Sequence, residues 1–290
     1  MTGIIDIGSN TIRLVIYDKG RQISNTGINS EIIADTKNRR LGDEGIDKLC
    51  SVIDFLKNKA DGIPVYAFAT YAVRILENSA EVKEKVLEKT GVGIDILSGD
   101  SEARYDFYGL RSCIAANESG IGVDLGGGSA QIMIFSGDEL EFIHSYPIGC
   151  RKLKNKFVSG KLPCEAEKKH IEEYVKGKLD VKTHDGKLYM MGGTAKTAAK
   201  LYSFLTGSEN ADMIKTETLT RLIEFIEETP EKTMKKILKN RYDNITAGIV
   251  IMGAIAEYFD KKEIYIKKCG VRDGYLMKIK EKQPLNGGGK

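Results

Sequence analysis

An internal repeat is the feature of this sequence that most restricts its fold. The stretch GIIDIGSNTIRLVIYDKGRQISNTG, residues 3–27, can be laid over IGVDLGGGSAQIMIFSGDELEFIHSYP, residues 121–147, without a gap. Three notable positions then coincide: Asp6 with Asp124, Gly8 with Gly126, and Thr11 with Ser129. Each copy is predicted to form a strand, a glycine turn, a second strand, a hairpin turn and a third strand.

Helix and strand patterns alternate after each copy. The first copy is followed by a helix face over residues 46–56, a strand at 64–69, a helix over 74–91, a strand at 93–97 and a helix at 101–113. The second continues in a similar order, with a helix near 164–180, a strand at 187–191, a helix from 192, a strand at 263–267 and extra helical sequence near 208–240. This order predicts an α/β protein of two duplicated domains, 1–116 and 117–290, with a flexible tail at 283–290.

Composition excludes several classes of protein. The 44 basic and 41 acidic residues give a net charge of only +3, which does not favour a nucleic-acid partner. The five cysteines are scattered and form no CxxC pair, so we expect reduced thiols and no zinc site. The sequence shows neither a signal-peptide pattern nor an apolar run near the roughly 20 residues that span a bilayer, so we expect a cytoplasmic protein without a membrane partner.

The two matched glycine turns predict a phosphate site. Glycine lets main-chain N–H groups point inward, and several such groups form an anion-binding nest. A single turn of this kind is as well explained by the needs of a hairpin. Two matched turns with hydroxyl residues beside them favour a phosphate held from both sides. The expected ligands are Ser9, Asn10, Thr11, Arg13, Gly127, Gly128 and Ser129.

A third glycine turn leads from a strand into a helix in MMGGTAKT. The unpaired N–H groups at a helix N-terminus attract phosphate, which makes Gly193 and Thr194 further candidate ligands. An ordinary helix start is the alternative. The GxxxxGK[ST] spacing of a P-loop is absent.

Two acidic residues stand at the predicted strand ends beside these turns. Asp6 and Asp124 would repel a polyanion unless a hard cation such as Mg²⁺ intervenes. Either residue alone is as well explained as a turn-capping Asp. Because they occupy matching positions, we favour a metal site, with Mg²⁺ or Mn²⁺ as the cofactor.

Charged residues elsewhere are candidates for the chemistry. Arg74, just after a predicted strand, offers a bidentate fork for phosphate, although a surface ion pair is the alternative. Glu102, in the first turn of a predicted helix, is a candidate base that activates water. The segment from residue 151 to residue 168 holds six cations that are either a solvated face or a guide for a long polyanion.

Together these segments resemble the exopolyphosphatase and guanosine pentaphosphate phosphatase family, within the actin, sugar-kinase and heat-shock-chaperone superfamily. The resemblance covers nearly the whole chain. It rests on DIGSNTIRLVIYD, ATYAVR, SGDSEARYDFYGL, VDLGGGSAQIMIF, IGCRKL, GGTAKT and GVRDGYL, in that order. It implies two ribonuclease-H-like (actin-like ATPase) domains, each a mixed five-stranded sheet flanked by helices, with the active-site cleft between them.

The resemblance also implies a reaction. The terminal phosphoanhydride of polyphosphate is hydrolysed, with Glu102 orienting or deprotonating the attacking water and Asp124 holding a divalent cation. Short chains are favoured, because the helical extensions of longer exopolyphosphatases are missing. Guanosine pentaphosphate, which also ends in a phosphoanhydride, is the alternative substrate. Family members often form dimers, which leaves a homodimer open.

Gln131 departs most from the family pattern, which has a glutamate at this position. Gln131 thus stands in a catalytic position. Its side-chain amide is a weaker ligand for a hard cation than a carboxylate would be. A binding regulator with weak activity is therefore a second class of function. A small-molecule kinase is a third, although neither an acceptor-activating Asp nor an adenosine pocket can be located in the sequence.

Overall fold

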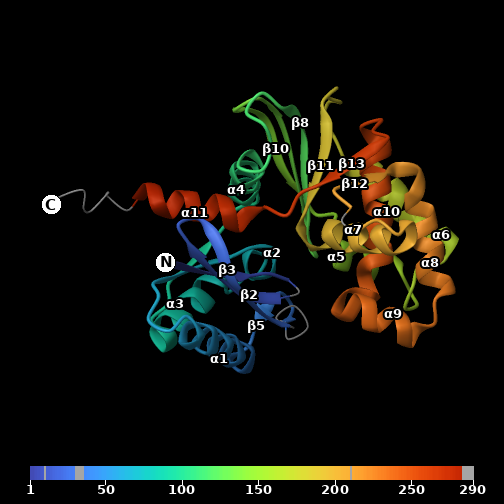
Figure 1. The fold of residues 1–290 in the computed structure, drawn as a ribbon. Helices are drawn as coiled ribbons and strands as arrows, with labels where there is room; N and C mark the ends of the chain where they lie inside the picture. Colours follow the sequence, from blue (N-terminus) through green and yellow to red (C-terminus); the bar gives the residue numbers. More distant parts are fainter. Residues whose placement is uncertain (10, 30–35, 210, 283–290) are drawn as a thin grey trace. The chain divides into compact units, whose positions relative to one another are not determined.

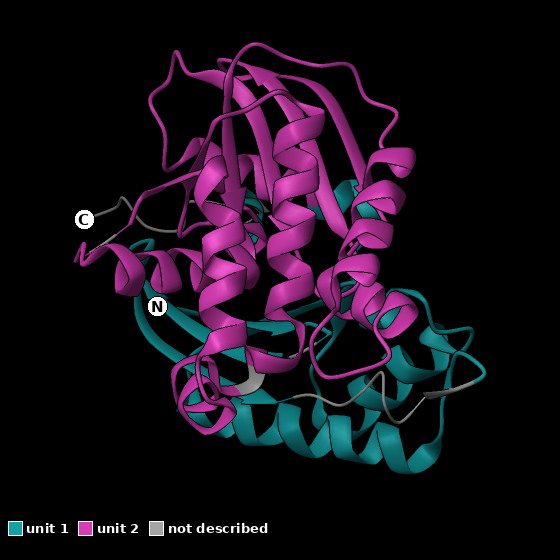
Figure 2. Ribbon diagram, turned by 90° about the vertical axis from the view of Figure 1, so that its right-hand side faces the viewer, with its two compact units in different colours: residues 1–102, 275–290 teal, residues 103–274 magenta. Residues whose placement is uncertain are grey.

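The structure is a computed structural model that describes residues 1–9, 11–29, 36–209 and 211–282; the predicted tail at 283–290 lies outside them. The chain forms two compact units (Figure 2), Met1–Glu102 with Tyr275–Lys290 as unit 1 and Ala103–Gly274 as unit 2. Two helices cross this division, because α4 (Gly99–Arg111) lies mostly in unit 2 and α11 (Val271–Lys282) mostly in unit 1. A domain boundary after residue 116 stays a prediction drawn from the repeat.

Unit 1 is built on a five-stranded mixed sheet in the order β3-β2-β1-β6-β7 (Figure 1). The first three strands are antiparallel neighbours, and β6 and β7 add in parallel. The strands are β1 Thr2–Ile7, β2 Thr11–Asp18, β3 Arg21–Asn29, β6 Val65–Ala69 and β7 Ile94–Ile96, and a separate pair is formed by β4 Thr36–Lys37 and β5 Arg40–Leu41.

Unit 2 repeats the plan with one addition. Its sheet has the order β10-β9-β8-β11-β13-β12, so its first five strands correspond in order and direction to those of unit 1. A sixth strand, β12, pairs antiparallel at the edge, where five strands were expected. The strands are β8 Ser119–Leu125, β9 Ala130–Ser136, β10 Glu139–Tyr146, β11 Lys187–Met191, β12 Met213–Lys215 and β13 Glu263–Ile266.

The strand register confirms the ungapped repeat. In unit 1, Asp6 lies opposite Arg13, and in unit 2 Asp124 lies opposite Gln131, at the equivalent position. Both turns close with the same main-chain hydrogen bond. It runs from the Gly8 amide to the Thr11 carbonyl in one copy, at 3.2 Å, and from the Gly126 amide to the Ser129 carbonyl in the other, at 3.0 Å. The duplicated fold with flanking helices is therefore the one predicted.

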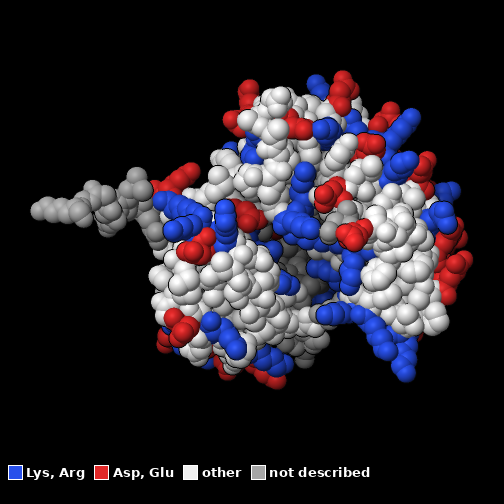
Figure 3. Space-filling model, in the orientation of Figure 1, with Lys and Arg blue, Asp and Glu red and all other residues white. Residues whose placement is uncertain are grey.

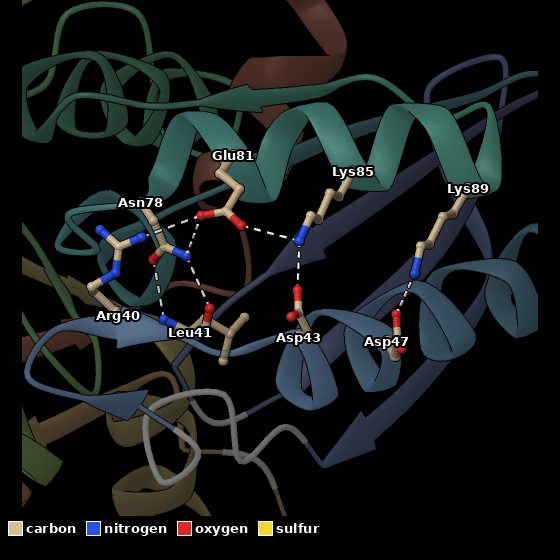
Figure 4. Close-up of polar contacts among 8 residues, drawn as sticks. All are labelled: Arg40, Leu41, Asp43, Asp47, Asn78, Glu81, Lys85 and Lys89. Atoms are coloured by element: carbon tan, nitrogen blue, oxygen red, sulfur yellow. Dashed lines mark hydrogen bonds and ion pairs between the residues drawn. The ribbon is translucent and has the colours of Figure 1, made fainter.

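Three helices of unit 1 cover one face of its sheet. They are α1 Asp43–Lys59, α2 Tyr71–Arg74 and α3 Ser79–Thr90, and α1 and α3 contribute apolar residues to a core shared with β1, β2, β6 and β7. Figure 4 shows the exposed polar contacts that link α1 to α3, including Lys85 with Asp43 and Lys89 with Asp47. Exposed pairs of this kind contribute little to stability, so the apolar core dominates the packing.

One helix prediction in unit 1 was too long. The chain between residues 74 and 79 is not helical, since α2 ends at Arg74 and α3 begins at Ser79. Asn78 explains the break: its side-chain amide donates to the carbonyl of Leu41 at 2.9 Å, and its oxygen accepts from the Leu41 amide at 3.1 Å (Figure 4). The C-terminal end was predicted correctly, because Gly91 caps α3 in the left-handed region with φ of 66°.

Unit 2 has helices on both faces of its sheet. One face carries a large apolar core around α10, a helix buried along most of its length, and the other packs against Phe107 and Leu110 of α4. The predicted extra sequence near 208–240 forms β12, two helices and two short 3₁₀ turns. The helices are α5 Cys150–Phe157, α6 Glu165–Lys178, α7 Gly192–Thr206, α8 Leu219–Glu228, α9 Glu231–Leu238 and α10 Tyr242–Tyr258.

The surface of the described residues is charged but mixed. Figure 3 shows Lys and Arg side chains interspersed with Asp and Glu over the face it displays, as a net charge of +3 leads one to expect. Within the described ranges, no helix is both long and apolar enough to cross a bilayer.

Gly109 provides a test of the α4 packing. A Cβ built on Gly109 would lie 2.3 Å from the carbonyl oxygen of Gly270. This clash could be relieved only by a shift of the backbone at one of the two residues. We expect Gly109→Ala to lower the free energy of unfolding by about 1–3 kcal/mol, as overpacking does. Urea unfolding followed by circular dichroism measures this change.

Gly177→Ala is the matched control. Gly177 is also helical, in α6, but has nothing within 4 Å of a built Cβ. Removing a helical glycine there should leave stability unchanged or raise it by about 0.5–1 kcal/mol. Equal effects of the two substitutions would contradict the packing argument.

Candidate active site

Each unit carries one half of the predicted site. In unit 1, Asp6 stands at the end of β1, and its Oδ1 would lie 3.8 Å from a Cβ on Gly8. Ser9 is buried in the turn, and Thr11 opens β2. The turn thus gathers three of the predicted residues, whereas Asn10 lies outside the described residues.

Arg13 lies along the sheet of unit 1. Its guanidinium donates to the side-chain oxygen of Asn25 and lies over Gly27, where a Cβ would come within 2.9 Å of Nη2. Both neighbours belong to β3. Gly27 therefore makes room for the arginine, and a phosphate-binding role for Arg13 stays a prediction.

Arg74 and Glu102 form an ion pair. Arg74 Nη1 donates to Glu102 Oε2 at 2.7 Å and to the carbonyl of Leu97 at 2.8 Å. Both side chains are mostly buried, with exposed fractions of 20% and 10%. The Ser98 hydroxyl caps this end of α4 by accepting from the Ser101 amide at 3.0 Å. Two residues predicted separately thus come together, and the pair holds the Glu102 carboxylate in one orientation.

The glycine turn of unit 2 is packed against α5. A Cβ on Gly149 would lie 2.4 Å from the backbone nitrogen of Gly128 and 2.5 Å from the carbonyl carbon of Gly127. The amides of Cys150 and Lys152 donate to the carbonyls of Gly126 and Gly127, both at 3.0 Å. Close backbone approach, and not a left-handed φ, therefore accounts for the glycine at position 149.

Gln131 is buried beside this turn. Its side-chain nitrogen donates to Ser129 Oγ at 2.9 Å and to Ser145 Oγ at 2.8 Å. It lies opposite Asp124 across β8 and β9, so the two side chains share one face of the sheet. The amide thus fixes the hydroxyl of Ser129, a predicted phosphate ligand.

The third glycine turn begins α7 at Gly192, as predicted. Gly192 has a φ of 84°, and a Cβ on it would lie 2.1 Å from Asp124 Oδ1, so the carboxylate rests directly on this backbone. Gly193 is covered by the guanidinium of Arg241, whose Nη2 would be 1.8 Å from a Cβ. The Thr194 hydroxyl is buried and donates to Cys150 Sγ at 3.5 Å, which leaves its main-chain N–H as the group that could meet a phosphate.

A second carboxyl group accompanies Asp124. Asp106, on α4 and fully buried, interacts with the Asp124 carboxyl group. Burial raises the pKa of Asp124, and the interaction with Asp106 offsets part of the rise, as do the positive charges of Lys196, Arg272 and Arg241. Burial together with Arg272 lowers the pKa of Lys196. Two acids and three cations therefore surround the N-terminus of α7.

Sequence reasoning missed four of these residues. Lys196 and Arg272 lie inside the quoted segments GGTAKT and GVRDGYL, but neither was chosen as a site residue. Asp106 lies four residues after Glu102 on α4, and helical periodicity predicts that such residues share a face. Arg241, in a short 3₁₀ turn before α10, carries no local signal.

The cationic segment does not form one continuous track. Lys168 is buried between Glu165 and Glu227, both at 2.7 Å, and Lys161 pairs with Glu231 at 2.9 Å. The Lys156 ammonium lies 3.8 Å from the centre of the Tyr174 ring. These three cations serve contacts within unit 2.

Comparison with known proteins identifies the family of this chain. Residues 20–283 match the sequence profile of the Ppx/GppA phosphatase family. The chain belongs to this family.

Its relatives include Exopolyphosphatase 1 of Mycobacterium tuberculosis, which is 25% identical over 299 residues, covering 95% of this chain and 87% of that protein. A bifunctional 3-dehydroquinate synthase/phosphatase of Fusobacterium nucleatum is 26% identical over 91% of this chain, which spans 44% of that protein. As a member of the Ppx/GppA phosphatase family, the chain is a phosphatase-type hydrolase.

Solved structures agree on the fold. The Ppx/GppA family member of Aquifex aeolicus superposes with a TM-score of 0.81 at 25% identity, over 98% of this chain and 99% of that one. An exopolyphosphatase from Cytophaga hutchinsonii superposes with a TM-score of 0.86 at 18% identity, over 99% of both chains, and supports the fold alone. The two duplicated actin-like domains expected from the sequence are thus confirmed.

Arg241 offers a test of the α7 end as an anion site. Because its guanidinium lies over Gly193, Arg241→Gln removes a charged donor there. We expect the Kd for tripolyphosphate to rise about 10- to 100-fold, the range that corresponds to losing one hydrogen bond to a charged group. Isothermal titration calorimetry measures this affinity. Arg221→Gln, which removes an exposed arginine of α8, is the control and should leave the Kd unchanged.

Proposed function

We propose that the protein releases terminal phosphate from inorganic polyphosphate, with short chains as the preferred substrate. The observation that carries this proposal is the pair of carboxyl groups of Asp124 and Asp106, set at the N-terminus of α7 among Lys196, Arg241 and Arg272. Carboxylates alone would repel a polyphosphate, and a site that binds phosphate through Lys and Arg alone has no use for carboxylates. The two kinds of group together fit a phosphate that binds with a divalent cation.

The donor set suits Mg²⁺ or Mn²⁺. Magnesium binds oxygen ligands, and it commonly takes one or two carboxylates and completes its shell with water and substrate phosphate. The two carboxyl groups of Asp124 and Asp106 match this requirement, and the described residues contain no group of three or more His, Cys, Asp or Glu that could hold a metal. Asp124 and Asp106 would hold the ion, and Asp6 of unit 1 stays a further candidate ligand. When bound, such an ion neutralises charge on the phosphate oxygens.

Other residues activate the water and bind the phosphate. Glu102, held by Arg74, orients the attacking water and accepts its proton. The main-chain amides of the glycine turns, Ser129 and the first turn of α7 bind phosphate oxygens. Phosphoryl transfer requires positioning and charge neutralisation more than a covalent nucleophile, and these groups supply both.

Guanosine pentaphosphate shares the terminal phosphoanhydride and is the alternative substrate. The binding-regulator alternative depends on Gln131, whose side-chain nitrogen is engaged by two serines where the family pattern has a carboxylate. Asp106 favours the enzyme, because it supplies a second carboxyl group beside Asp124.

Glu102→Gln tests the proposed reaction. Losing a general base should slow phosphate release about 10²- to 10⁴-fold while the Kd for tripolyphosphate stays within a few-fold. Release is measured with Mg²⁺ or Mn²⁺ on tripolyphosphate, long-chain polyphosphate and guanosine pentaphosphate, whose relative rates also identify the substrate. Glu77→Gln, at an exposed glutamate of unit 1, is the control. Unchanged turnover in Glu102→Gln would refute the assignment of the base, and tight binding without turnover by the wild type would establish the regulator.

The cation site is tested by binding as well as by activity. Asp106→Asn removes one of two carboxylates, so we expect the Kd for Mn²⁺, followed by electron paramagnetic resonance, to rise about tenfold or more. Gln131→Glu adds a carboxylate facing Asp124 and should lower the Kd or raise turnover. Asp138→Asn, at an exposed aspartate, should change neither. An unaltered Mn²⁺ affinity in Asp106→Asn would exclude Asp106 as a ligand.

A further inference from the structure

Two cysteines meet where α4 ends and α11 begins. The backbones of Gly109 and Gly270 are in direct contact, with 2.3 Å between a Cβ built on the first and the carbonyl oxygen of the second. Cys113 follows Gly109 by four residues, in a turn that prolongs α4 through a 2.9 Å hydrogen bond from its amide to the Leu110 carbonyl. Cys269 directly precedes Gly270. The close backbone contact thus brings the two thiols together.

The two thiols have different surroundings. Cys113 is exposed, whereas Cys269 is buried in the apolar cluster that α4 forms with the sheet of unit 2, with its sulfur 3.8 Å from the sulfur of Met191. The Cys269 thiol interacts with the Cys113 thiol, and the Ser112 hydroxyl lies 3.7 Å from the Cys113 sulfur.

These contacts make Cys113 the reactive member of the pair. The interaction with Cys269 lowers the pKa of Cys113 to about 6, assisted by Ser112 and Lys267 and opposed by burial and Asp273. The same interaction, together with burial, raises the pKa of Cys269. An accessible thiolate reacts with oxidants, while a buried thiol at its side is placed to resolve the product.

We propose that Cys113 and Cys269 form a peroxide-sensitive pair that closes into a disulfide. The Cys113 thiolate attacks the peroxide, forming an S–O bond as the O–O bond breaks and hydroxide leaves. The Cys269 sulfur then attacks the Cys113 sulfur, forming the S–S bond, and the S–O bond breaks with loss of water. Two thiols are oxidised by two electrons, and one hydrogen peroxide is reduced to two waters.

The disulfide would form beside the proposed cation ligands. A Cβ built on Gly270 would lie 3.5 Å from Asp106 Oδ1 and 3.8 Å from Asp124 Oδ2, so the residue next to Cys269 borders both carboxyl groups. Drawing Cys269 toward Cys113 shifts this backbone. We therefore expect oxidation to lower phosphate release severalfold, with recovery in dithiothreitol. This consequence rests on the proposed function, whereas formation of the disulfide does not.

Mass spectrometry tests the pair directly. The protein is treated with hydrogen peroxide, its remaining thiols are blocked, and it is cut with trypsin and an endoproteinase specific for Glu. We expect one dominant disulfide, joining SCIAANE (residues 112–118) to CGVR (residues 269–272). In Cys269→Ser, Cys113 should instead stop at the sulfenic acid and be trapped by dimedone. Absence of the linked peptides, or linkage of Cys113 to other cysteines at equal yield, would overturn the proposal.

Cys164 is the matched control for reactivity. It is exposed as well, at the start of α6. At pH 7, iodoacetamide should label Cys113 severalfold faster than Cys164, because more of Cys113 is thiolate and only part of that gain is lost to lower nucleophilicity. Equal labelling would contradict the assignment. In the activity assay, Cys113→Ser should become insensitive to peroxide and Cys164→Ser should not. If the disulfide forms but phosphate release does not change, only the proposed effect on the carboxyl pair is refuted, and the assignment of the cysteine pair stands.

Discussion

The contact between the Asp124 carboxylate and the backbone of Gly192 is the constraint on which the unit 2 half of the site depends. It exists because β8 and β11 are parallel neighbours, so that the end of one strand faces the turn leaving the other. A side chain at Gly192 would occupy the position of Oδ1, 2.1 Å from its Cβ. The acid, the helix N-terminus and the guanidinium of Arg241 over Gly193 are thereby held within one turn of α7.

Equivalent positions of the two repeats hold side chains of different chemistry. Arg13 and Gln131 occupy equivalent register positions, and each reaches from the second strand of its unit to the third, to Asn25 in one and to Ser145 in the other. One is a cation and the other a neutral amide. The fold fixes where these side chains point, and the residue type decides what they offer.

Much of the fold could be predicted because it is local or repeated. The hydrophobic alternation of the strands and the glycine turns appear twice, and the register of Asp6 with Arg13 follows from the length of the turn. Residues beside those turns, and the strand-to-helix turn at Gly192, could be recognised for the same reason. The break at Asn78 could not be foreseen, since it depends on a hydrogen-bonded contact with Leu41, distant in sequence. Arg241 and Asp106 were missed because only tertiary packing brings them to Gly193 and Asp124.

The exchange of α4 and α11 has a consequence for dividing this chain. A fragment that ends at residue 116 would keep α4 but lose the strands against which Phe107 and Leu110 pack. It would also lack Tyr275, whose hydroxyl donates to Asp95 at 2.6 Å and whose ring lies 4.8 Å from that of Phe68. A single cut therefore exposes apolar surface in both products. A stable separate unit 1 would need α11 joined to it directly, which requires a rearranged chain order. The boundaries of the sequence repeat therefore differ from those of the compact units.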